Sequence, residues 1–461
     1  MASRGGFSSK FGFIAAAAGS AIGLGNIWQF PYVTGQNGGA AFLLLYIGWI
    51  LFLGLPIMIG EIAIGRKTRS NPYGAYKALG GKSWALVGLF GIICGIMILS
   101  FYNVVSGWAF GYFVNVAFGD LLQKHDYSGF FDYFVHDFTD NLIFSLGFML
   151  ITAFIVYQGV QKGIEGAAKL LMPTLFVLLV SLVIYGLTLP NAMDGVRFYL
   201  LPDFSLINGA SIYSALGQAF FSLSLGMGAL ITYGSYVGKD DNIISSAGLV
   251  SITDTLVSFL AGMMIFPLVF STGQSPSEGP GLVFVALPAV FESMGPVLGK
   301  FIGSSFFLLL CFAALTSTIS LLEVPVSYLV DEKKLSRGKA VIIMAAVVFL
   351  IGVPSMLGFG AVDLFTSFVH YEGASKSVMD VVQDVFYVIG LPLGGLLMSI
   401  FIARKWKIEN MSEEVSKGYP GYIGSSLETF ITVMISYICP LVLGIMFILT
   451  ILQKFFGINF I

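Results

Sequence analysis

Residues 18–31, AGSAIGLGNIWQFP, decide the fold of this 461-residue chain. They lie in an apolar segment long enough to cross a membrane, yet they place Gly19, Gly23, Gly25 and Asn26 near its middle. Each glycine lowers helix propensity by about 1 kcal/mol relative to alanine, so an unbroken helix is disfavoured here. Irregular backbone in a bilayer must be covered by protein or line a watery cavity. The stretch therefore predicts a site within the membrane, with close helix packing through Gly19 and Gly23 as the alternative.

The composition is that of an integral membrane protein. Hydrophobic residues make up 57% of the chain and charged residues only 10%, against about 25% charged in an average soluble domain. The net charge of −2 offers no signature of nucleic-acid binding. Cys94, Cys311 and Cys439 all lie in apolar runs, so we expect buried thiols rather than disulfides. We find neither a paired nucleophile and base nor a metal cluster, so an enzyme is not expected.

Apolar runs of about 17–25 residues predict transmembrane helices. Eleven such runs lie near residues 11–34, 41–65, 84–117, 141–158, 167–188, 211–236, 243–270, 300–329, 339–357, 377–403 and 426–452. With a cytoplasmic N-terminus, eighteen of the 23 Lys and Arg residues fall on the cytoplasmic side and five outside, as the positive-inside rule requires. The C-terminus is then outside. We expect short helices rather than a further span in the connection 271–299.

The sixth run is interrupted in the same way as the first. Its middle reads SLSLGMG over residues 222–228. Two broken segments that begin about 200 residues apart, each opening a block of five helices, are typical of transporters built from inverted repeats. This pairing favours the site over the packing alternative.

Several motifs, in order along the chain, resemble those of the neurotransmitter:sodium symporter family. They are GLGNIWQFP at 23–31, NGG at 37–39, Pro56 to Glu61 with Gly65-Arg66, QAFFSLSLG at 218–226 and LTST at 315–318. The resemblance implies an all-α integral membrane protein with 11 transmembrane helices, in the 5+5 inverted-repeat (LeuT-type) fold with unwound helices 1 and 6. The transporter core would cover residues 1–402, with a first repeat at 1–190 and a second at 211–402. Residues 403–461 would form a cytoplasmic linker and the eleventh helix.

By this resemblance the chain carries two Na⁺ ions and one amino acid. The first sodium site would use Ala21, Asn26, Ser222 and Asp254, and the second Gly19, Ile22, Ala313, Thr316 and Ser317. The substrate would meet Ala21, Leu24, Gly25, Ile98, Tyr102, Phe221, Ser222, Ser224, Met227, Ser317 and Leu321. Na⁺ is a hard cation that prefers several oxygen ligands, and a helix N-terminus at Leu24 and Gly25 favours a carboxylate. The apolar lining with a flexible methionine predicts broad choice among hydrophobic and aromatic amino acids.

Two intramembrane carboxylates are expected to be functional. Glu61 matches a family residue that braces the unwound first helix. In chloride-dependent relatives the ion lies among residues matching Tyr46, Gln218, Ser222 and Ser258, and an Asn stands where this chain has Asp254. A fixed negative charge there would repel chloride. We therefore expect no chloride requirement.

The resemblance also places the gates. The inner gate would pair Arg4 and Phe7 with Asp331, supported by Tyr236. At the outer gate, Gln29 and Gln383 replace the family's Arg and acidic partner; if Asp384 faced the vestibule instead, the alignment would be off by one residue. Gly163 and Pro173 fit a pattern that lets the fifth helix of bacterial relatives unwind. A static kink is the alternative.

These observations predict a sodium-coupled symporter for hydrophobic L-amino acids, working by alternating access in a bacterial inner (plasma) membrane. Its expected partners are the small-molecule substrate and the lipid bilayer, with no nucleic acid, and a monomer should suffice for transport. The alternatives are an amino-acid-binding membrane receptor and a transporter of the same architecture that sodium does not drive.

Overall fold

The structure is a computed structural model that describes residues 6–271, 273 and 281–458. Nine helical segments in these ranges are long and apolar enough to cross a membrane. They are Ala40–Thr68 (α3, Ala40–Trp49, and α4, Leu55–Thr68), Lys82–Ala117 (α6), Phe138–Tyr157 (α8), Val160–Gly186 (with α9, Gly166–Gly186), Ile243–Ser271 (α13), Leu298–Asp331 (α15), Arg337–Leu357 (α16), Val378–Trp406 (with α18, Val378–Val382, and α19, Gly390–Ile400) and Ser426–Phe456 (α21, Ser426–Val433, and α22, Cys439–Phe456).

The first crossing is broken where the glycines predict. Helix α1 (Lys10–Ala21) begins where the Ser9 hydroxyl accepts the N–H of Gly12 at 3.0 Å, and it ends before Ile22, which has an extended backbone (φ −77°, ψ 109°). The chain then resumes as Gly25–Gln36, a π-helical turn (Gly25–Gln29) followed by α2 (Phe30–Gln36), bent by 51° from α1. This bent pair makes the tenth crossing.

The sixth expected span is broken as well. Helix α11 (Gly209–Ser222) is capped by Asn208 and Ser211 and ends at Ser222, and α12 (Ala229–Gly234) follows. Between them Ser224 and Gly226 have φ values of 54° and 83°. A Cβ on Gly226 would lie 2.3 Å from the Leu391 carbonyl oxygen, so space as well as φ requires glycine. Together α11 and α12 occupy the sixth of the eleven spans that the sequence predicts.

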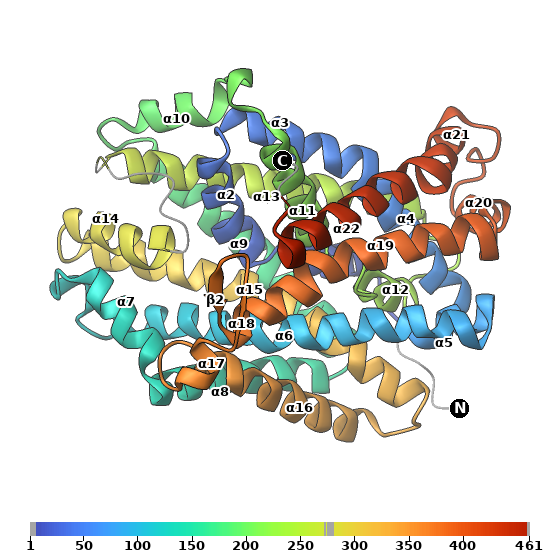
Figure 1. Ribbon diagram of the computed structural model, residues 1–461, viewed down its shortest axis with the longest axis horizontal. Helices are drawn as coiled ribbons and strands as arrows, with labels where there is room; N and C mark the ends of the chain where they lie inside the picture. Colours follow the sequence, from blue (N-terminus) through green and yellow to red (C-terminus); the bar gives the residue numbers. More distant parts are fainter. Residues whose placement is uncertain (1–5, 272, 274–280, 459–461) are drawn as a thin grey trace.

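Short elements gather at the two ends of the molecule (Figure 1). Helices α7 (Tyr127–His136), α10 (Ala192–Leu200) and α14 (Leu287–Ser293) lie at one end, and α5 (Pro72–Gly80), α20 (Ile408–Ser416) and α21 at the other. The expected short helix in the connection 271–299 is α14, preceded by a π-helical turn (Leu282–Ala286). One feature departs from the all-α expectation: β1 (Val369–Tyr371) and β2 (Ala374–Lys376) form an antiparallel hairpin after α17 (Asp363–Thr366). The remaining elements of the described residues are 3₁₀ turns at Leu121–Gln123 and Phe204–Leu206 and π-helical stretches at Ile50–Gly54, Val160–Glu165, Gln383–Ile389, Phe401–Trp406 and Met434–Ile438.

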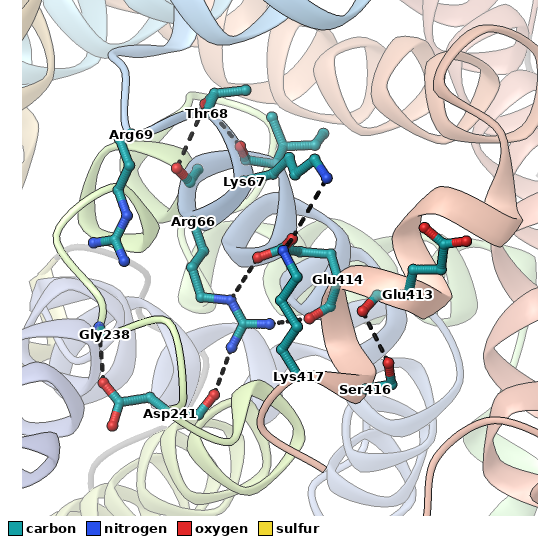
Figure 2. A network of polar contacts seen from close by, with 12 residues as sticks. Arg66, Lys67, Thr68, Arg69, Gly238, Asp241, Glu413, Glu414, Ser416 and Lys417 are labelled. Carbon is teal, nitrogen blue, oxygen red and sulfur yellow. Dashed lines mark hydrogen bonds and ion pairs between the residues drawn. The ribbon is translucent and has the colours of Figure 1, made fainter. Parts of the chain in front are cut away.

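A buried arginine joins three segments at the end that carries α20, as Figure 2 shows. From the end of α4, Arg66 donates its Nε to the Glu414 carboxylate at 2.9 Å, one Nη to the Asp241 carbonyl at 2.5 Å and the other to the Glu414 carbonyl. Burial opposes ionisation of Glu414, but hydrogen bonds from Lys417 and Arg66 hold its pKa below the ordinary value. The contribution of Glu414 to stability is therefore present at neutral pH and is lost as the pH falls toward the folded-state pKa.

Arg66→Met should lower the free energy of unfolding by about 3–5 kcal/mol, because it leaves the buried Glu414 carboxylate with only lysine partners and deprives the carbonyls of Asp241 and Glu414 of their donor. Lys67→Met is the matched control, since Lys67 approaches the same carboxylate only at 4.0 Å and is partly exposed. Its effect should stay within about 0.5 kcal/mol. Thermal melts in detergent check both variants. Equal melting temperatures for Arg66→Met and Lys67→Met would contradict the role assigned to the buried network.

Candidate substrate and sodium sites

The two helix breaks meet around one cavity. Its volume is about 20 Å³, room for about one water molecule. The lining residues come from the broken segments, α6 and α15, and they are Ser20, Ala21, Gly23, Gly25, Ile98, Tyr102, Phe221, Ser222, Ser224, Met227, Ser317 and Leu321. Ten of the eleven residues expected to bind substrate thus line this cavity. The exception is Leu24, which lines the larger cavity described below.

The backbone of the first break is held by side chains from other helices. The N–H of Leu24 donates to the Tyr102 hydroxyl at 2.7 Å, so the group expected to bind a carboxylate is bonded to Tyr102 in this state. Gln218 donates to the carbonyl of Gly25 at 3.0 Å. Ser224, one of the residues expected to bind substrate, donates to the Ser20 carbonyl at 2.8 Å and so ties the two breaks together.

Asp254 is fully buried at the centre of a ring of donors. Its carboxylate accepts from Asn26 Nδ2 at 2.7 Å, from the Ser222 hydroxyl at 2.8 Å and from the Tyr46 hydroxyl at 3.0 Å. Ser258 completes the ring, 2.8 Å from Asn26 Nδ2 and 3.1 Å from the Tyr46 oxygen. Three of the four residues expected around a chloride ion therefore surround this carboxylate, and the fourth, Gln218, points to the backbone of the first break instead.

A second group of oxygens lies where α15 passes the first break. The Thr316 hydroxyl is 2.9 Å from the Ala313 carbonyl oxygen and 3.2 Å from that of Ile22. The Ser317 hydroxyl is 3.4 Å from the same Ile22 oxygen. Gly19 packs directly against Thr316, since a Cβ on Gly19 would lie 3.2 Å from the Cβ of Thr316. The residues expected at the second sodium site are thus neighbours, and their oxygens are of the kind that a hard cation binds.

A larger cavity of about 350 Å³ adjoins the first. Gly25, Tyr102 and Phe221 line both cavities and so form the wall between them. The other residues around the larger cavity are mostly aromatic: Leu24, Trp28, Gln29, Tyr32, Phe101, Val105, Trp108, Phe131, Phe359, Met379, Asp380, Gln383 and Tyr387. We call this larger cavity the vestibule.

Comparisons with known proteins identify the family to which this architecture belongs. The model of the sodium:neurotransmitter symporter family matches residues 4–126 and 136–457. The chain belongs to this family. Its members are sodium-dependent transporters rather than enzymes, and this chain is a multi-pass membrane protein of the same kind.

Relatives and a solved structure cover nearly the whole symporter chain. The sodium-dependent transporter YhdH of Bacillus subtilis (strain 168), described as uncharacterized, is 40% identical over 447 residues, 96% of each chain. The sodium-dependent serotonin transporter of Drosophila melanogaster is 28% identical over 97% of this chain and 76% of its own length. The crystal structure of MhsT in complex with L-phenylalanine superposes with a TM-score of 0.88 at 43% identity, covering 96% of this chain and 99% of that one. The fold is therefore the LeuT-type inverted repeat.

The two residues expected at the outer gate, Gln29 and Gln383, both line the vestibule. Gln29 donates to the Tyr387 hydroxyl at 2.8 Å, and the Tyr387 ring packs on Phe221 with centroids 4.4 Å apart. Gln383 lines the vestibule beside Gln29, whereas Asp384 faces away and bonds to Tyr371. Sequence reasoning missed Tyr387, although a tyrosine one helical turn after Gln383 was the available signal.

Aromatic and polar contacts hold the described residues that are expected at the inner gate. Phe7 packs edge-on against Tyr233 and Tyr236, and its N–H donates to the Tyr236 carbonyl at 3.3 Å. Asp331 accepts the backbone N–H of Asn71 at 3.0 Å. Arg4, the expected partner of Asp331, lies outside the described residues.

Two buried carboxylates near the residues expected at the inner gate were not anticipated. Glu323 binds Arg337 at 2.5 Å and the Tyr236 hydroxyl at 2.7 Å. Glu165, on the π-helical turn Val160–Glu165 that carries Gly163, accepts the N–H of Ser8 at 2.7 Å and binds Lys169 at 2.6 Å. The start of α1 is therefore held against the segment expected to unwind. Glu323 stands in the expected span 300–329, so the cost of burying a carboxylate there was a signal that could have found it. Glu165 lies just before the expected span 167–188 and gave no such signal.

The expected role of Glu61 needs correction. Its carboxylate accepts the N–H of Gly226 at 2.8 Å and so braces the second break rather than the first. The physical reason is the packing of α4 against α12, which brings Glu61 to the free backbone groups between α11 and α12. Motif position identified the residue but could not tell which of the two breaks it faces.

Proposed function

We propose that this chain is a sodium-coupled symporter that imports hydrophobic and aromatic L-amino acids by alternating access and needs no chloride. The observation that carries the proposal is the shared cavity: two irregular backbone segments, two groups of oxygen ligands and an apolar lining meet in one place. The L-phenylalanine bound to MhsT, 43% identical, supports the same substrate class here.

Coupling follows from shared ligands. In this proposal Na⁺ at the first site contacts Ala21, Asn26, Ser222, Asp254 and the substrate carboxylate. Each ligand then binds more tightly when the other is present, and the coupling free energy is reciprocal. The second ion, at Gly19, Ile22, Ala313, Thr316 and Ser317, joins α15 to the break in the first crossing. Its departure toward the inside would free α1 to move.

The carboxylate of Asp254 takes the place of chloride. A chloride ion among Tyr46, Ser222 and Ser258 would lie beside a fixed negative charge in a region of low dielectric, which is strongly unfavourable. The donors around Asp254 instead stabilise the carboxylate of the protein.

The two cavities suggest how substrate enters. The vestibule leads from the outer ends of the helices to Phe221, and the small cavity lies behind that ring. The amino acid would pass Phe221, displace Tyr102 from the N–H of Leu24 with its own carboxylate, and place its side chain against Ile98, Met227 and Leu321.

The proposal also covers the division of the chain, the oligomeric state and the membrane in which the protein lies. The core is residues 1–402, with the linker and eleventh helix in 403–461, and one monomer suffices for transport. The protein lies in a bacterial plasma membrane, with its N-terminus in the cytoplasm and its C-terminus outside.

Binding of labelled L-phenylalanine to the purified protein tests this function. Saturable binding in NaCl and in sodium gluconate, absent in choline chloride and competed by Leu, Trp and Tyr but not by Asp or Lys, is the expected result. Binding that is equal without Na⁺ would favour the alternative transporter that sodium does not drive. No binding of any amino acid would refute the proposed substrate class.

A further inference from the structure

A group of four charged residues lies behind the outer gate, outside the vestibule. Lys454, near the end of α22, has its Nζ 3.0 Å from Asp384 Oδ1 and 3.1 Å from Glu372 Oε2. Lys376 of the β1–β2 hairpin binds the same Glu372 oxygen at 3.0 Å. Burial opposes ionisation of Glu372, but hydrogen bonds from Lys376 and Lys454 hold its pKa below the ordinary value. The group is balanced, with two positive and two negative charges.

Uncharged contacts reinforce these ion pairs. The Tyr371 hydroxyl donates to Asp384 Oδ2 at 2.6 Å, and the Tyr371 ring packs on Phe455, with centroids 5.7 Å apart. The hairpin, the outer end of α22 and the segment Gln383–Ile389 are thereby joined at one point. In Figure 1 the hairpin is drawn next to α18, the helix that directly precedes this segment, and β2 contacts α18. We call Lys454, Asp384, Glu372 and Tyr371 the outer clasp.

Asp384 belongs to the segment that carries the gate. Gln383–Ile389 is a π-helical stretch between α18 and α19, and such stretches are less regular than an α-helix and are frequent at functional sites. Gln383 and Tyr387 face the vestibule from one side of it, while Asp384, only 7% exposed, faces the clasp on the other. Holding Asp384 in place therefore sets the rotation of this segment about its axis, and that rotation directs Tyr387 toward Gln29.

We propose that Lys454 is a positioning residue of the outer gate, which holds the segment Gln383–Ile389 in the orientation that closes Tyr387 over the substrate. This inference rests on the proposed function for its transport consequence, but not for its structural one. Without Lys454, the nearly buried Asp384 keeps the Tyr371 hydroxyl but loses its counter-charge. A buried carboxylate in that position moves toward water, and the segment turns with it.

Dissociation of L-phenylalanine in NaCl tests the gate. Lys454→Met should speed dissociation about fivefold, a factor that matches the loss of a partly exposed ion pair. Lys454→Arg, which retains the charge, should stay within about twofold of the unaltered protein. Lys376→Met is the matched control, because Lys376 binds Glu372 without contacting Asp384. It too should stay within about twofold.

Three results would overturn the assignment: unchanged dissociation in Lys454→Met, no rescue by Lys454→Arg, or equal acceleration in Lys376→Met. A merely structural role would lower the melting temperature without this pattern of rates.

Hydrogen–deuterium exchange separates the clasp from the proposed function. Amides of residues 383–389 should exchange faster in Lys454→Met than in Lys376→Met, with or without amino acid present. If the unaltered protein bound no L-phenylalanine but this difference appeared, the proposed substrate class would fail while the clasp stood. Equal exchange in both variants would overturn the clasp whatever the protein binds.

Discussion

Asp254→Asn should make uptake depend on chloride. The substitution removes the fixed negative charge but leaves the donors of Tyr46, Ser222 and Ser258 in place around the vacated position. A chloride ion can then supply the charge that the Na⁺ site needs. We expect NaCl to stimulate uptake by the variant at least about tenfold over sodium gluconate. The unaltered protein should respond equally to both salts.

A second substitution tests where the chloride acts. In the Asp254→Asn background, Ser258→Ala removes one donor that lies 3.1 Å from the Tyr46 oxygen. It should weaken the chloride response and raise the chloride concentration needed for half-stimulation. If Asp254→Asn transported at the same rate in both salts, the idea that Asp254 replaces the halide would be wrong.

Thr316→Val should raise the Na⁺ concentration for half-maximal binding by about tenfold or more, because it replaces a hydroxyl ligand by a methyl group that cannot coordinate a cation. Valine has nearly the shape of threonine, so the packing against Gly19 is kept. The measurement is the Na⁺ dependence of L-phenylalanine binding at fixed ionic strength.

Thr318→Val is the control for that measurement. Its hydroxyl lies two residues along α15 and pairs with Thr152 at 2.9 Å, away from the first break. We expect a small loss of stability and no change in the Na⁺ requirement. A similar shift in both variants would mean that the effect comes from general loosening of α15 rather than from a lost ligand.

The sequence predicted the breaks because their cause is local. Glycines and small polar residues in the middle of an apolar run weaken the helix whatever surrounds them, and the structure ends α1 at Ala21 and α11 at Ser222 accordingly. Nine of the crossings and the bent pair that makes the tenth were predictable for the same reason, since length and hydropathy are properties of short windows.

Contacts between distant segments could not be predicted in this way. Glu61 faces the second break and not the first, and Arg66 finds Glu414 across 348 residues of sequence. The hairpin that carries Glu372 is too short and too polar to give a strand signal. In each case the packing of the helices decides which residues meet. No local pattern in a single sequence reports that packing. Asp254 was expected beside Asn26 and Ser222 only because the known fold of the family places the matching residues together.

An inward sodium gradient should drive accumulation of hydrophobic amino acids by this protein. Uptake of labelled L-phenylalanine into proteoliposomes tests it most directly, under an inward Na⁺ gradient with chloride or gluconate as the anion. We predict accumulation above the external concentration in both salts and its collapse when the Na⁺ gradient is dissipated. Saturable binding without accumulation, or accumulation that persists without Na⁺, would contradict the account.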